Sequence, residues 1–177
     1  MNRLNTGRGL KRKAVAAALV ALVILAFLLK NQVAAMVTES TDLTSLTVTG
    51  IRLGQNIAEL DLSRTPKDPS FTDKKAGDTE YVYYKDFSIA YNRSGEIIIL
   101  RTMSPEGVVS AGELTLHTLE EAAGILGKHY TVRMYDYDQG LRARVYYDKK
   151  SRIKSSFVYP HKYRKEGIII WAILERY

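Results

Sequence analysis

Residues 14–29 form an uninterrupted apolar run, AVAAALVALVILAFLL, and a helix over this run would be apolar on every face. As an α-helix these 16 residues rise about 24 Å, slightly less than the ~30 Å hydrocarbon core of a bilayer. Lys30 can extend its ammonium group to the membrane surface, and apolar residues resume at 33–37. The pattern therefore predicts a single transmembrane helix over residues 14–30 that contacts membrane lipid.

The charges beside this run predict its orientation. Residues 1–13 carry five Lys or Arg and no acid, whereas residues 31–50 carry two acids and no base. Because basic residues flank membrane helices on the cytoplasmic side, we expect a cytoplasmic N-terminus and an extracytoplasmic C-terminal part of a single-pass cell-membrane protein. A cleaved signal peptide is the alternative, because Val33-Ala34-Ala35 offers small residues at a cut site. It would leave a secreted protein.

Polar and small residues over 31–46 predict a tether, and the folded domain is expected to cover 47–177. Within this domain, apolar residues and polar turns predict the same order of elements twice, which divides it into repeats of about 47–105 and 113–177. The predicted strands, one pair in each repeat, are 87–91, 97–100, 141–147 and 153–158.

A helix signal precedes the strands of each repeat. In the second repeat, Thr118 can cap a helix, Glu121 is in capping-box position and Gly127 can end it. In the first, Asn56 can cap only one or two turns before Pro66. Together these signals predict an α+β fold in which an N-terminal transmembrane helix is followed by two repeats of a short helix packed on an antiparallel β-meander.

Two further segments stand out from the repeats. Residues 63–79 are polar and contain two prolines and a glycine, a length that compact domains rarely leave unstructured. A functional loop, a mobile segment and a tolerated insertion remain open for it. Residues 168–174 are apolar on both faces of a strand, which predicts an interior strand at the seam between the two repeats.

The opening Ile-Arg-Leu-Gly-Gln-Asn-Ile at 51–57, followed by a short helix and a strand meander in a doubled arrangement, resembles the helix-plus-antiparallel-sheet module of bacterial envelope proteins. The tandem form is similar to the β-lactamase-inhibitor-protein-like fold, and the single form to the SmpA/OmlA outer-membrane assembly lipoproteins. The resemblance covers about 47–177 and rests on element order with Leu53-Gly54 and Leu126-Gly127. It implies an interaction module rather than an enzyme. Unlike those lipoproteins, the chain has no anchoring cysteine.

Charge and cysteine content exclude several classes of function. The chain has 26 Lys plus Arg against 19 Asp plus Glu, but six of the bases lie in residues 1–30, which leaves a net charge of +1 (20 − 19) for 31–177. The basic surface that nucleic-acid binding needs is therefore not expected, and we predict no nucleic-acid partner. The absence of cysteine excludes disulfides, thiol catalysis and Cys-ligated metals.

Catalytic and metal-binding patterns are also missing from the sequence. His117, His129 and His161 are 12 and 32 residues apart, which is no metal-ligand spacing. The serines lie in turns or links without a nucleophile-elbow context, and the glycines form no phosphate-binding loop. We therefore expect no catalytic residue, metal or cofactor. A cell-surface hydrolase or transferase is the alternative.

Strand alternation indicates a candidate recognition face. On 141–147 the apolar positions alternate with Arg142, Arg144 and Tyr146, and we expect the apolar face to contact the helix. On the preceding strand, one face carries Arg133, Tyr135 and Tyr137. Arg and Tyr often anchor protein interfaces, so these six residues are the predicted partner-binding set. A solvated face on which Arg stems and Tyr rings cover each other is the alternative.

The sequence thus predicts a membrane-anchored, extracytoplasmic protein-interaction or regulatory module of a bacterial cell envelope, with an envelope protein as its partner.

Overall fold

The structure, a computed structural model, describes residues 33, 35–104, 107–163 and 167–177. It divides the chain into Met1–Val37 and Thr38–Tyr177, and the second unit is considered below. The predicted transmembrane run lies outside the described residues. Within the described residues, no helix combines the length and apolar character that crossing a bilayer requires.

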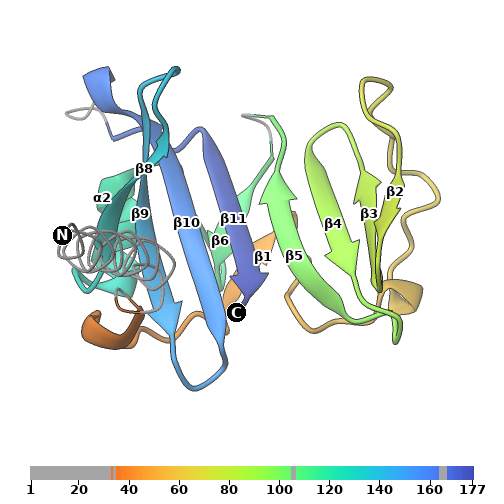
Figure 1. Ribbon diagram of the computed structural model, residues 1–177, viewed down its shortest axis with the longest axis horizontal. Coiled ribbons are helices and arrows are strands. Elements are labelled where there is room, and N and C mark those ends of the chain that lie inside the picture. Colours follow the sequence, from red (N-terminus) through yellow and green to blue (C-terminus); the bar gives the residue numbers. More distant parts are fainter. Residues whose placement is uncertain (1–32, 34, 105–106, 164–166) are drawn as a thin grey trace, which may run out of the picture. The chain divides into compact units, whose positions relative to one another are not determined.

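Eight strands form one antiparallel sheet in the order β2-β3-β4-β5-β11-β10-β9-β8 (Figure 1). The strands of the first meander are β2 (Lys74–Ala76), β3 (Thr79–Tyr83), β4 (Phe87–Tyr91) and β5 (Ile97–Thr102). Those of the second are β8 (Thr131–Asp136), β9 (Leu141–Asp148), β10 (Ile153–Pro160) and β11 (Trp171–Arg176). The fold is thus α+β with far more strand than helix, and the predicted hairpins 87–100 and 141–158 are confirmed.

The two meanders meet through their last strands. Strand β11 pairs with β5, with Leu174 opposite Leu100, so it lies inside the sheet as predicted. The first strands of the two halves also pair, since Thr47 of β1 (Leu46–Val48) lies opposite Ser110 of β6 (Val109–Ala111). Pairing of first with first and last with last strand is what an approximate two-fold relation between the halves produces.

This topology corrects the alignment of the two halves by one strand. The sequence pattern matched 87–91 to 141–147, whereas sheet order makes β4 the counterpart of β10 and β5 the counterpart of β11. The physical reason for the misalignment is that β2, with the sequence Lys-Lys-Ala, is fully exposed and has no apolar alternation from which a strand could be predicted. It lies inside the polar segment 63–79, for which the sequence predicts no strand.

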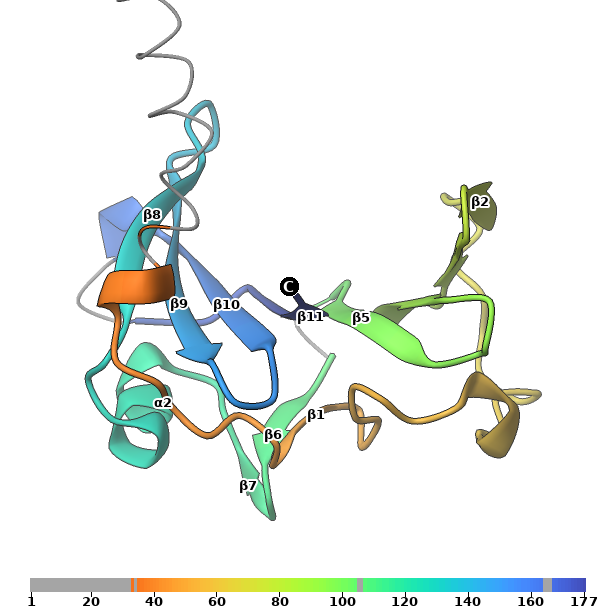
Figure 2. The ribbon, with the colours of Figure 1, turned by 60° about the horizontal axis from the view of Figure 1, so that its bottom comes forward.

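A second layer covers one face of the large sheet (Figure 2). It consists of α2 (Leu119–Leu126), a small sheet ordered β1-β6-β7, with β7 at Leu114–Thr115, and the segment around Ile51. Buried side chains from both layers form a single core, among them Leu46, Val48, Phe87, Ile97, Leu100, Val109, Leu119, Phe157 and Leu174. We call this face of the sheet the core face and its opposite the open face.

Both helix signals are confirmed. Thr118 Oγ1 accepts a hydrogen bond from the Glu121 N–H at 3.2 Å, and the Glu121 carboxylate accepts one from the Thr118 N–H at 2.9 Å. This capping box starts α2, whose Leu119 and Ala122 pack into the core. In the first half, Asn56 caps the single 3₁₀ turn η1 (Ile57–Glu59), the short helix expected there. A second 3₁₀ turn, η2 (His161–Tyr163), follows β10.

The predicted tether is wrong for its second half, because the folded unit begins at Thr38. The Thr41 N–H donates to the Tyr147 carbonyl at 2.8 Å, and the Leu43 N–H donates to the Asp148 carboxylate at 3.2 Å. Leu43 is buried in the core. Two leucines, Leu43 and Leu46, among Thr, Ser, Asp and Glu give too little periodicity to reveal this strap from the sequence.

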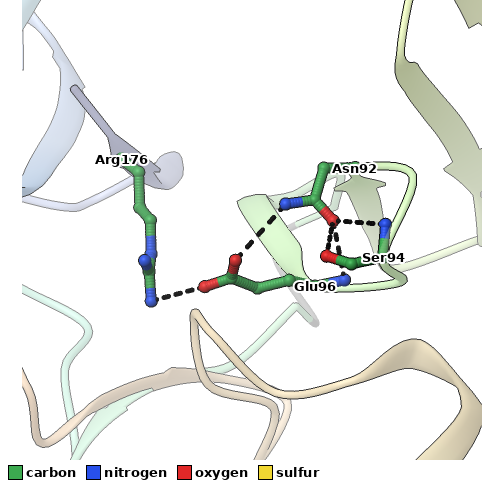
Figure 3. Close-up of polar contacts among 4 residues, drawn as sticks. All are labelled: Asn92, Ser94, Glu96 and Arg176. Carbon is green, nitrogen blue, oxygen red and sulfur yellow. Dashed lines mark hydrogen bonds and ion pairs between the residues drawn. The ribbon is translucent and has the colours of Figure 1, made fainter.

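A polar network fixes the β4–β5 hairpin to the end of β11 (Figure 3). Asn92 Oδ1 accepts hydrogen bonds from the Ser94 N–H, the Ser94 hydroxyl and the Glu96 N–H at 3.1, 2.7 and 3.0 Å. The Glu96 carboxylate pairs with Arg176 at 2.7 Å. Because Arg176 belongs to β11, this contact ties the hairpin of one meander to the last strand of the other.

Candidate functional site

The open face carries a groove of about 560 Å³ over the first meander and β11. In strand register, Tyr83, Ser88, Arg101 and Ile173 form one row across β3, β4, β5 and β11. At a spacing of about 4.8 Å between strands, the outer two strands lie roughly 14 Å apart. The row therefore crosses the groove from Tyr83 on one wall to Ile173 on the other, with Ser88 on the floor.

The floor is low because β4 presents small side chains to the open face. Ser88 and Ala90 line the groove, whereas the alternate residues Phe87 and Ile89 are buried in the core. The same alternation on β3 directs Tyr81 and Tyr83 into the groove. Small residues between aromatic ones thus create a concave surface on an otherwise regular sheet.

The long segment 63–79 supplies the first wall. Phe71 stacks on Tyr83 with ring centroids 5.2 Å apart and remains 49% exposed. The segment is held against β3, since the Asp68 N–H donates to the Tyr83 carbonyl at 3.2 Å and the Asp73 carboxylate accepts from the Tyr83 N–H at 3.1 Å. The segment whose role the sequence left open therefore brings an exposed aromatic ring to the groove.

Trp171 and Ile173 form the second wall. Both are only partly buried, so β11 is interior to the sheet but its open-face side chains are accessible in part. The Arg101 guanidinium lies over the Trp171 ring at 5.0 Å, and the Tyr135 ring contacts Trp171 with centroids 5.9 Å apart. In this wall the Trp171 ring therefore contacts both a guanidinium and a second aromatic ring.

Arg101 is the basic group among the lining residues, and its Nε is buried without a hydrogen-bond partner among the residues that the structure describes. Asp68 is the acidic one, and its carboxylate accepts a hydrogen bond from the Ser70 N–H at 2.8 Å, which forms a turn. Such a surface can stack flat apolar groups and bind one anionic group at Arg101. Within the described part of the chain, no three His, Asp or Glu side chains converge as metal ligands would.

The predicted partner-binding set does not share one face, which corrects the expectation from alternation. Arg144 lies on the core face, where its guanidinium donates to the Leu119 carbonyl of α2 at 2.9 Å and lies 4.7 Å from the Tyr130 ring centroid. Tyr146 is fully buried beside it, with its hydroxyl donating to the Gly127 carbonyl at 3.3 Å. Burial raises the pKa of Tyr146 to about 12. Arg142 alternates with them and shares that face.

The remaining three residues lie elsewhere. Arg133 is on the open face and donates to the Tyr147 hydroxyl. Tyr135 contacts the groove through Trp171, and Tyr137 is 82% exposed in the turn after β8. Alternation of apolar and polar residues did not identify the core face of β9, because Tyr146 and Tyr147, on opposite faces, are both buried. The polar side chains on the core face are accommodated there by hydrogen bonds.

Sequence reasoning missed most of the groove. Its clearest signal was the small-residue alternation of Ser88 and Ala90 between aromatic Tyr83 and Tyr91. Its two walls come from residues about 90 to 100 positions apart, Phe71 or Tyr83 and Trp171, which only the pairing of β5 with β11 brings near each other.

Comparison of the chain with protein-family models, with curated proteins and with solved structures found no match.

Proposed function

We propose that this protein is a membrane-anchored, extracytoplasmic binding module of a bacterial cell envelope, and that it holds a protein partner in the open-face groove. The observation that carries the proposal is the groove itself. It combines Tyr, Trp, Phe, Met and Arg, the residue types enriched where proteins meet. Phe71 in particular keeps half of its surface in water in the absence of a partner.

The anchoring part of the proposal rests on the apolar run 14–29 and on the five bases that precede it. The resemblance of 47–177 to envelope interaction modules supports the same placement. A layer with α2 covers one face of the sheet, and on the opposite face the groove over β3, β4, β5 and β11 is accessible to a partner.

Site-specific photocrosslinking of the full-length protein in its membrane tests the binding role. A photoreactive phenylalanine analogue at Phe71 is compared with the same analogue at Leu114, which is 61% exposed but lies in the small sheet. We expect protein adducts from position 71 and few from position 114. Trp171→Ala in the same chain should reduce the adducts at 71. Equal adducts at both positions, or none at 71, would contradict the proposed role of the groove.

Membrane fractionation tests the anchor separately. The full-length protein should stay with membranes through carbonate and high-salt washing, and residues 40–177 should be open to protease added from outside. Release of a mature chain that begins near Met36 would instead establish the signal-peptide alternative.

A further inference from the structure

The hairpin tip formed by the end of β8 and the turn before β9, residues 135–140, is rich in aromatic and acidic residues and projects from the sheet (Figure 2). Tyr137 is 82% exposed, and the neighbouring Asp138 is also exposed. Asp138 has neither a hydrogen bond nor an ion pair with the residues that the structure describes. Large aromatic side chains in this setting are typical interface anchors.

Hydrogen bonds within the turn and to His161 support the backbone of the tip. The Gly140 N–H donates to the Tyr137 carbonyl at 3.1 Å, and the Gln139 N–H donates to the Asp136 carboxylate at 2.9 Å. The Gly140 carbonyl in turn accepts a hydrogen bond from the His161 N–H at 3.0 Å. A preorganised loop loses little conformational entropy when it docks, which favours binding through this tip.

The groove is lined by groups that suit this tip. Its aromatic walls can stack a tyrosine ring, and Arg101 contributes a guanidinium to its lining. A carboxylate is the acceptor that a guanidinium binds best. Tyr137 and Asp138 therefore supply a ring for the aromatic walls and a carboxylate for Arg101.

Within one copy of the chain the tip lies beside the groove but does not occupy it. Tyr135, at the base of the tip, contacts Trp171 in the groove wall, whereas Tyr137 projects into solvent. In a pair of copies related by a two-fold axis, contact of one tip with the other copy's groove implies its symmetric equivalent.

We propose that the groove takes a second copy of this chain, with Tyr137 of one copy between the aromatic walls of the other and Asp138 paired with Arg101. The inference rests on the proposed binding function and names the partner as the chain itself. The exchange is reciprocal, so two tips and two grooves form the interface.

Cysteine crosslinking tests this directly, because the native chain has no cysteine. Full-length Ser88→Cys and Gln139→Cys chains, carrying different tags, are produced together in membranes and oxidised. Ser88 lies on the groove floor and Gln139 beside Asp138, so we expect a disulfide between differently tagged chains. Glu113→Cys, an exposed position in the turn before β7, replaces Gln139→Cys as the matched control and should give none.

Charge reversal tests the pairing of Asp138 with Arg101. Arg101→Glu or Asp138→Arg alone should lower the yield of the Ser88–Gln139 crosslink about tenfold or more, since loss of one anchor commonly costs that much in affinity. Chains that carry both reversals should recover the crosslink, because the pair is restored with opposite polarity. A circular dichroism spectrum like that of the parent shows that each variant is folded.

A crosslink no stronger than the Glu113→Cys control would overturn the proposed self-association. So would single reversals that leave the crosslink unchanged, or a doubly reversed chain that stays as weak as either single variant. Adducts from Phe71 to other proteins would persist if only the self-association is wrong, whereas their absence as well would contradict the binding function itself.

Discussion

Arg144→Ala should destabilise the protein, in contrast to what a solvated Arg face would show. The Arg144 guanidinium donates to the Leu119 carbonyl at the start of α2 and lies over the Tyr130 ring. Among the described residues of Thr38–Tyr177, α2 is the only α-helix. Removal of the Arg144 side chain therefore weakens the attachment of α2 to the large sheet.

The expected loss follows from these two contacts. A hydrogen bond from a charged donor contributes about 1.5 to 3 kcal/mol, and a cation over an aromatic ring about 0.5 to 1 kcal/mol at an exposed site. Because Arg144 is only partly buried, the lower ends apply, and we expect a loss of about 2 kcal/mol in the free energy of unfolding. Arg144→Lys keeps the charge but not the planar group, so about half of that loss should remain.

Urea denaturation of the full-length protein in a non-ionic detergent measures the loss, with the single tryptophan, Trp171, as the fluorescent reporter. Arg142→Ala is the matched control, because Arg142 is on the same strand and face but its side chain makes no hydrogen bond or ion pair with a described residue. It should change stability by no more than about 0.5 kcal/mol. Equal effects of the two substitutions would refute the assignment of Arg144 to a specific contact with α2.

Three further predictions concern other parts of the fold. Gly124→Ala should stabilise the protein by about 1 kcal/mol in thermal melts, since the residue lies inside α2 and an added Cβ would meet nothing within 4 Å; a lower melting temperature would contradict this. Asp148→Ala should cost about 2 to 3 kcal/mol in urea melts, because the buried carboxylate accepts hydrogen bonds from the Leu43 and Ser151 N–H groups; a loss below about 0.5 kcal/mol would mean that water replaces it. The pKa of Tyr146, raised from 10.0 to about 12 by burial, keeps the folded state protonated where the unfolded state ionises, so the free energy of unfolding should fall as the pH rises through this range. Tyr146→Phe should weaken that fall between pH 10.0 and about pH 12, and an unchanged profile would assign it to other groups.

The amino-acid sequence by itself determined the local elements of this protein. The capping box of Thr118 and Glu121, the Asn56 cap and the hairpin turn at Asn92 all depend on hydrogen bonds among residues close in the chain. Such contacts form wherever the chain goes next, so spacing alone reveals them. The apolar character of 168–174 also predicted a strand inside the sheet, and β11 is one, although its Trp171 and Ile173 side chains are only partly buried.

The tertiary structure alone decided which faces and strands meet. Alternation separates Ala143 from Arg144 but does not say which of them faces α2, and the outcome was set by the Leu119 carbonyl, which gives the Arg144 guanidinium an acceptor on the core face. Likewise, pairing of β5 with β11 joined the two halves and brought the Phe71 and Trp171 walls to one groove. These are contacts between residues far apart in the chain, and their free energy depends on packing that no single segment contains.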